Sequence, residues 1–137
     1  MAGLYDHYKG VEPGSITSAT SSLRQKVESA RSKLGSFKTS LSDSVWKANA
    51  KQTLFKAFDT LDTDVYEEIL DKLSKVDEIA AEITKYNSAK GRAEGYLDSL
   101  NNSNKNTPQS SINTWRQNLS TEEGTMRECV SNINNLL

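Results

Sequence analysis

The 137-residue sequence has very few of the residues that build disulfides and metal sites. Its only cysteine is Cys129, which excludes an intrachain disulfide, and its only histidine is His7, far away in the sequence. A structural zinc site needs several such ligands, so we do not expect one. We interpret Cys129 as a helix residue beside the core.

An excess of charge of one sign is also missing. The 17 Lys and Arg residues nearly cancel the 18 Asp and Glu residues, and the two signs are interspersed. No basic face is therefore expected to attract nucleic acid or anionic lipid. The first residues lack the apolar stretch of a signal peptide, and no run reaches the length of a membrane span. We expect a protein made in the cytoplasm, whose export would need another route.

Motifs that carry chemistry are absent as well. The sequence has no Gly-rich phosphate loop, no Cys or His ligand set and no Gly-x-Ser-x-Gly elbow. Asp59, Asp62 and Asp64 lack the glycine and the bidentate glutamate of a calcium loop, so helix capping or plain solvation explains them better. The sequence thus predicts no enzyme, with no catalytic residue, cofactor or metal.

What the sequence does contain is helical periodicity, although Leu, Ile, Val and Phe make up only about a fifth of it. The first periodic stretch has apolar or small residues at alternating spacings of four and three: Ile16, Thr20, Leu23, Val27, Ala30, Leu34, Phe37 and Leu41. This is a heptad pattern with Ser, Lys, Arg, Gln and Glu between its members. Such a narrow stripe must lie against a partner helix.

A second periodic stretch runs from about Trp46 to Leu100. Its spacing drifts between Leu61 and Leu73, which indicates a stutter in a continuous helix; the alternative is a break near Asp62. Glycines at positions 91 and 95 predict a kink or fraying. After an Asn-rich linker, Thr107 as N-cap and Pro108 as first helical residue predict a third helix.

The fold class predicted from these patterns is all-α. We expect an antiparallel, coiled-coil-like helical hairpin extended by a third helix, and a four-helix bundle if two chains associate. A compact bundle closed by a break in the central helix is the alternative. The expected organisation is a flexible N-terminal arm over residues 1–14, the hairpin over 15–100, a linker over 101–107 and a C-terminal helix over 108–137.

The expected hairpin turn carries a family resemblance. Residues 44–50 read Ser-Val-Trp-Lys-Ala-Asn-Ala and are followed by Leu-Phe and Phe at helical spacing. The stretch over residues 16–100 resembles the Trp-x-Gly (ESAT-like) proteins of type VII secretion systems, in which two antiparallel helices meet at a Trp-x-Gly turn. Trp46 takes the place of the family tryptophan, and Ala48 stands where glycine is usual. The family's Tyr-x-x-x-Asp/Glu signal is not matched, because the residue four positions after Tyr86 is Lys90 and the residue four positions after Tyr96 is Leu100.

The resemblance implies a non-enzymatic substrate or partner of a type VII secretion system that is secreted without a cleavable signal peptide. Its protein partner would be a second copy, another helical protein or a larger type VII effector. Apolar residues of the second helix exceed what one partner helix covers, which predicts an interface at Phe55, Phe58, Leu70, Ile79 and Tyr96. Two other functions remain open: a coiled-coil structural or scaffold protein of phage or cytoskeletal type, and a toxin-binding or immunity module.

Overall fold

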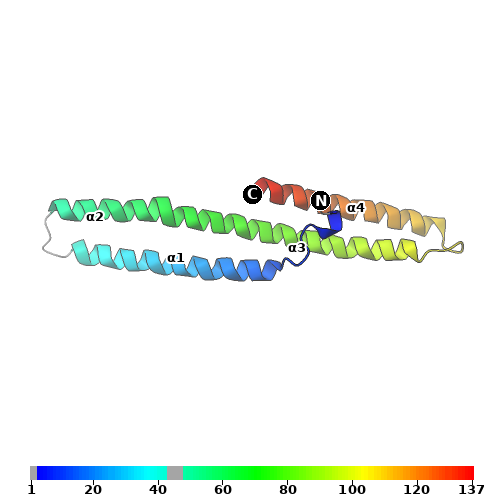
Figure 1. Cartoon of the computed structure of the whole chain (residues 1–137), viewed down its shortest axis with the longest axis horizontal. Helices are drawn as coiled ribbons and strands as arrows, with labels where there is room; N and C mark the ends of the chain where they lie inside the picture. Colours follow the sequence, from blue (N-terminus) through cyan, green and yellow to red (C-terminus); the bar gives the residue numbers. More distant parts are fainter. Residues whose placement is uncertain (1–2, 43–47) are drawn as a thin grey trace. The chain divides into compact units, whose positions relative to one another are not determined.

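The computed structural model describes residues 3–42 and 48–137, and within them the chain is helical without any strand. The predicted all-α fold class is confirmed. Figure 1 follows the order of the elements from a short 3-10 turn near the N-terminus to the C-terminal helix. The elements are η1 (Leu4–Asp6), α1 (Pro13–Ser42), α2 (Ala48–Thr60), η2 (Leu61–Tyr66), α3 (Glu67–Asn101) and α4 (Gln109–Leu136).

The predicted second helix is unbroken from α2 to α3. η2 joins them as a π-helical segment, so the stutter expected from Leu61 onward takes the form of wider turns and the alternative break near Asp62 is not seen. α3 also continues through Gly91 and Gly95, where the sequence predicted a kink or fraying. No side chain approaches either glycine closely enough to meet an added Cβ. These glycines are therefore ordinary exposed helix positions.

The chain divides into two compact units, each with its own packing. The first, here called the hairpin unit, is Ser15–Asp77, and the second, here called the α3–α4 unit, combines Met1–Gly14 with Glu78–Leu137. α3 contributes its first residues to the hairpin unit and the remainder to the α3–α4 unit.

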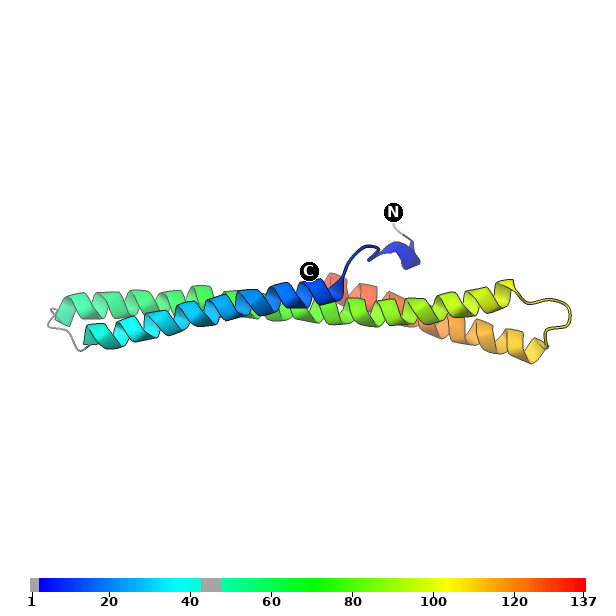
Figure 2. The same ribbon diagram turned by 90° about the horizontal axis from the view of Figure 1, so that it is seen from below.

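The hairpin unit pairs α1 with α2, η2 and the start of α3. Figures 1 and 2 both draw α1 alongside them. Three ion pairs fix the register: Arg24 with Asp77 at 2.9 Å, Arg31 with Asp62 at 2.6 Å and Lys38 with Asp59 at 2.7 Å. As the residue number rises along α1 it falls along the partner, so the helices are antiparallel, as predicted.

Burial in the hairpin unit is incomplete. Among its described side chains only Thr20 and Leu73 are buried, at 4% and 8% exposure, while Val27 and Leu34 in the predicted stripe are half-buried. Two helices touch along one line, so residues beside that line keep part of their surface in water. The side chain of Leu41 and all of residues 43–47, where the sequence predicts the hairpin turn, lie outside what the structure describes.

The α3–α4 unit has a closed core. α4 runs antiparallel to α3, with Arg92 bound to Glu122 at 2.9 Å and Asn132 donating to Glu82 at 3.3 Å. Its central cluster is almost inaccessible to solvent and consists of Tyr86, Ala89, Ala93, Met126 and Cys129. Partly buried residues of the N-terminal segment pack against this cluster. The segment therefore acts as a third layer over the two helices.

The segment expected from the sequence as a flexible N-terminal arm over residues 1–14 makes specific contacts with both helices through its described residues. Tyr86 donates its hydroxyl hydrogen to the carbonyl of Leu4, and Tyr5 donates to Glu123 at 2.7 Å. The Tyr8 ring meets Tyr86 edge-on, with 4.8 Å between centroids. Glycines and the absence of periodicity suggested disorder, but three large side chains give the segment enough surface to dock. Gly10, at φ +81°, adopts a left-handed backbone conformation that glycine reaches without strain.

The start of α4 also differs in detail from the prediction. Pro108 is the N-cap, and the helix begins one residue later, at Gln109. Thr107 does not cap the helix with its side chain; its hydroxyl accepts a hydrogen bond from the backbone N–H of Asn104 at 3.0 Å. The carbonyl of Pro108 accepts the first bonds of the helix, from Ser111 and Ile112. Thr107 therefore stabilises the linker turn.

Candidate interaction surface

The hairpin unit has two distinct sides. Along α1, Thr20, Val27 and Leu34 recur every seven residues and face the partner helix. In an α-helix the residues three and four positions after such a row lie on opposite flanks of it. Leu23 and Arg24 therefore fall on opposite sides of the row. Along α3, Val76 and Asp77 flank the buried Leu73 in the same way.

The contacts show which flanks belong together. Arg24 and Asp77 each follow a residue of the central row by four positions, and they bind each other. The two flanks that carry them therefore lie on the same side of the hairpin. Leu23 and Val76, which follow by three, consequently share the other side. We call the first the ion-paired side and the second the open side.

The ion-paired side is held by charges. Arg31 donates to both carboxylate oxygens of Asp62, at 2.6 and 3.1 Å, and to Glu67 at 2.8 Å. The hydrogen bond to Asp62 raises the pKa of Arg31. Lys38 binds Asp59 at 2.7 Å. Asp59 and Asp62 therefore pair with α1, while their side chains remain 68% and 43% exposed to solvent.

Asp77 forms the end of this ion-paired row. Hydrogen bonds from the hydroxyl of Thr20 and from Arg24 lower the pKa of Asp77, outweighing the opposite effect of burial. Thr20 belongs to the apolar stripe predicted from the sequence, yet it is buried as a hydrogen-bond donor. A polar residue at this position thus connects the two helices directly.

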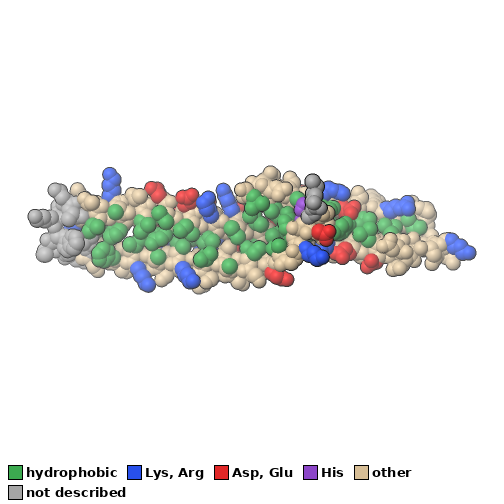
Figure 3. All heavy atoms as spheres, viewed as in Figure 1, with side chains coloured by type: hydrophobic (Ala, Val, Ile, Leu, Met, Phe, Trp, Pro, Cys, Tyr) green, Lys and Arg blue, Asp and Glu red, His purple; other side chains and the backbone are tan. Residues whose placement is uncertain are grey.

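The open side has no such pairing and exposes large apolar side chains. Figure 3 shows green side chains gathered in a stripe along the hairpin, between α1 and its partner. Phe37 meets Phe58 edge-on, with 5.6 Å between ring centroids, but half of Phe37 remains exposed. The most exposed members are Leu23 at 49%, Phe37 at 50%, Val65 at 42%, Ile69 at 38% and Val76 at 37%.

The α3–α4 unit provides an internal comparison. It too is built on an antiparallel pair of helices, but Leu4, Tyr5 and Tyr8 cover the cluster around Tyr86. Its central residues are at most 3% exposed, against 37% or more for those of the open side. Within the hairpin unit, no other described residue covers the open side. The open side is therefore the candidate interaction surface, because clustered exposed apolar residues commonly mark such sites.

The interface residues predicted from the sequence do not lie together on this surface. Phe58 contacts the open side through its ring, which meets that of Phe37 edge-on. The amine of Lys38 lies 5.6 Å from the ring centroid of Phe55, which places Phe55 near the ion-paired side. Leu70 precedes Leu73 by three residues and therefore also lies toward the ion-paired side. Ile79 and Tyr96 belong to the α3–α4 unit. All five side chains are half-buried.

By their spacing, Leu23 and Phe37 of the open side belong to the heptad stripe predicted for the first helix. Ile16, Leu23, Ala30 and Phe37 form one of the two rows of the heptad stripe, beside the row of Thr20. Two such rows make the narrow seam that a single partner helix covers in a coiled coil. The spacing therefore gives no signal that Leu23 and Phe37 stay exposed.

The turn motif that carries the family resemblance is described only in part. Ala48 is the first residue of α2, and Trp46 lies outside the described residues. Comparison of the chain with family models, characterised proteins and solved structures gives no match. The Trp46 and Ala48 motif therefore remains a sequence-based resemblance.

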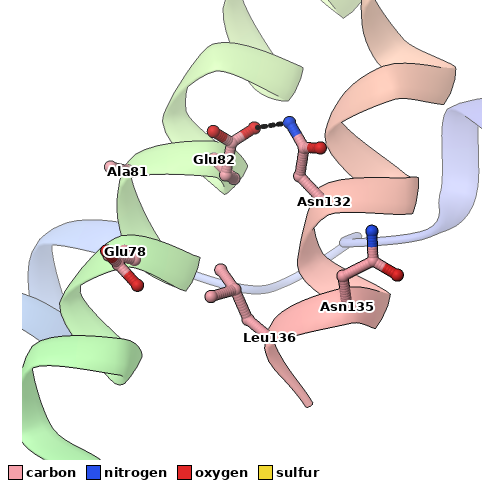
Figure 4. Close-up of a pocket in the computed structure, with 6 residues that line it drawn as sticks. All are labelled: Glu78, Ala81, Glu82, Asn132, Asn135 and Leu136. Carbon is pink, nitrogen blue, oxygen red and sulfur yellow. Dashed lines mark hydrogen bonds between the residues drawn. The ribbon is translucent and has the colours of Figure 1, made fainter. Parts of the chain in front are cut away.

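A hollow of about 350 Å³ lies between α3 and α4, as Figure 4 shows. Glu78 and Glu82 are its two acidic groups, and Glu82 accepts hydrogen bonds from Asn132 and from Lys85, both at 3.3 Å. Burial raises the pKa of Glu82, but these bonds and one from the thiol of Cys129 outweigh burial and lower it. Glu82 is thus already paired within the chain and offers little to a ligand.

Chemistry elsewhere in the described chain is limited. Cys129 is 3% exposed, as expected for a residue at the core, and burial together with its bond to Glu82 raises the pKa of its thiol to about 11. The thiol is therefore neutral near pH 7 and poorly nucleophilic. Within residues 3–42 and 48–137 no group of three or more His, Cys, Asp or Glu side chains is placed to hold a metal. No helix there is long and apolar enough to cross a membrane.

Proposed function

We propose that this chain is a non-enzymatic helical partner or substrate of a type VII secretion system and acts by binding another helical protein. The observation that carries the proposal is the open side of the hairpin unit, where Leu23 and Phe37 are each about half exposed. Helical hairpins with an uncovered apolar side gain stability when a further helix covers it. The type VII assignment is supported by the sequence resemblance around Trp46 and Ala48.

The distribution of exposed side chains favours binding over a purely internal role. Five large apolar residues of the hairpin unit are exposed on one side, while its other side is closed by ion pairs. A spacer that only holds its ends apart needs no such difference between its sides. Binding through one side explains why the apolar residues are not distributed around the helices.

Affinity purification from a host that carries a type VII system tests the proposal. We expect the tagged chain to recover a helical protein of that system. The double variant Leu23→Ser/Phe37→Ser should lose this protein, because serine removes the apolar contact from the open side. The matched control Val11→Ser/Leu137→Ser changes two exposed apolar residues of the α3–α4 unit and should retain it. Circular dichroism of each variant verifies that its helices persist.

Two results would contradict this proposal. Equal recovery by both double variants would mean that the open side is not the binding surface. Recovery of no type VII component would remove the secretion assignment. For Trp46→Ala, we expect reduced export of a folded protein, and normal export would remove the motif on which the resemblance rests.

A further inference from the structure

The margins of the open side differ in charge. Along α1, Lys26 follows Leu23 by three residues and Lys33 follows Ala30 by three, so both lysines border the apolar row. Both are exposed and form no ion pair with another described residue. The only acidic residue of α1, Glu28, follows Arg24 by four and therefore lies toward the ion-paired side. Within α1, the charged residues of this margin are therefore both basic.

The opposite margin, on η2 and α3, carries both signs. Lys72 and Lys75 are positive, whereas Asp64 and Glu68 are negative. Glu68 and Lys72 are 3.9 Å apart and largely exposed, so they attract each other only weakly. Figure 3 shows blue and red side chains along the α2 and α3 edge of the hairpin, and blue side chains along the α1 edge with a red one below the N-terminal end of α1.

We propose that the occupant of the open side is an amphipathic helix of a different protein, with Asp or Glu residues along the margin that faces Lys26 and Lys33. This inference rests on the proposed function as a helical partner and names the chemistry of the other chain. The apolar stripe of the partner helix would cover the surface around Leu23 and Phe37, and its carboxylates would pair with the lysines of the α1 margin. Complementary margin charges select a partner and accelerate its association.

A second copy of this chain complements the charges at the edge of the open side less well. If α1 packed against α1 of another copy, Lys26 and Lys33 would face lysines, and like charges opposed across an interface disfavour that pairing. If α1 packed against η2 and α3 of another copy, it would meet a margin that also contains Lys72 and Lys75. A margin of acidic residues alone fits better than either arrangement.

Designed peptides provide a defined probe. Two amphipathic helices with leucine at heptad positions a and d would differ only at positions e and g, which carry Glu in one and Lys in the other. Fluorescence anisotropy of the labelled peptides against the full chain measures binding. We expect the Glu peptide to bind at least about tenfold more tightly at low salt, and the difference to shrink as salt screens the lysines.

Charge reversal locates the effect. Lys26→Glu/Lys33→Glu should invert the preference, so that the Lys peptide binds more tightly. Lys9→Glu/Lys105→Glu makes the same change in net charge at two exposed lysines of the α3–α4 unit and should leave the preference unchanged. Leu23→Ser/Phe37→Ser should weaken both peptides. These three variants separate margin charge, overall charge and apolar contact.

The inference is overturned if neither peptide binds, if both bind equally, or if the two charge-reversal variants behave alike. A stable homodimer that Leu23→Ser/Phe37→Ser dissociates would also overturn it, and analytical ultracentrifugation of the chain tests this directly. Its failure is distinct from that of the proposed function. A preference for the Glu peptide without recovery of a type VII component contradicts only the secretion assignment, whereas recovery of that component without the preference contradicts only the acidic margin.

Discussion

Replacing Tyr86 with phenylalanine tests the role of the N-terminal segment as the third layer of the α3–α4 unit. Tyr86 is 1% exposed, and its hydroxyl donates to the carbonyl of Leu4. Such a bond contributes about 0.5–1.5 kcal/mol net, and a buried group left unpaired costs about 1–3 kcal/mol. Leu4 is only half-buried, so water partly replaces the lost bond. We expect a local destabilisation of about 1–3 kcal/mol.

Hydrogen–deuterium exchange followed by mass spectrometry measures this effect where it is expected. Peptides covering residues 3–11 should exchange faster in Tyr86→Phe, while peptides from α1 should not change, because the hairpin unit packs independently. Tyr96→Phe is the matched control, since Tyr96 is half-buried in the same helix. Identical exchange of residues 3–11 in the two variants would refute the reasoning and restore a loosely attached arm.

Three further changes test the packing and the titrating groups. Leu34→Ala, at a half-buried position, should lower the free energy of unfolding by about 1–3 kcal/mol in urea titrations. The exposed neighbour Lys33→Ala should stay within about 0.5 kcal/mol of the wild-type value, and equal effects of the two changes would invalidate the heptad assignment. Asp77 has a lowered pKa, so its ion pair stabilises the fold above the ordinary aspartate pKa and loses this effect as the pH falls below about 4. Asp77→Asn should therefore lose less stability than the wild type on acidification, and parallel curves of unfolding free energy against pH would argue against the pairing. Cys129, with a pKa of about 11, should react slowly with a thiol reagent at neutral pH and rapidly in denaturant, and rapid labelling of the native chain would contradict its burial.

Heptad spacing predicted much of the fold because it reports local geometry. The spacing from Ile16 to Leu41 indicated α1, and the longer pattern indicated a continuous second helix. The drift after Leu61 even located the π-helical segment. The exact start of α4 was displaced by one residue because Thr107 bonds within the linker. Local choices between a side-chain cap and a linker turn are too close in energy for spacing to decide.

The candidate surface was harder to predict because spacing does not say how many helices cover a stripe. Leu23 and Phe37 have the same periodicity as buried residues, and only the pairing of Arg24 with Asp77 shows which flank remains open. The contacts of the N-terminal segment were hard to predict for a different reason. Tyr5 and Tyr8 have no helical period, yet their partners Glu123 and Tyr86 are distant in the sequence. Contacts between residues so far apart leave no local pattern.

The central claim is that the open side of the hairpin unit binds another helical protein. Zero-length carbodiimide crosslinking in the native host, followed by mass spectrometry of the purified chain, tests it most directly because this reagent joins lysines to neighbouring carboxylates. We predict crosslinks from Lys26 and Lys33 to Asp or Glu residues of a second, helical protein, and their loss in Leu23→Ser/Phe37→Ser. Recovery of the chain as a monomer, with neither lysine joined to another protein, would contradict the account.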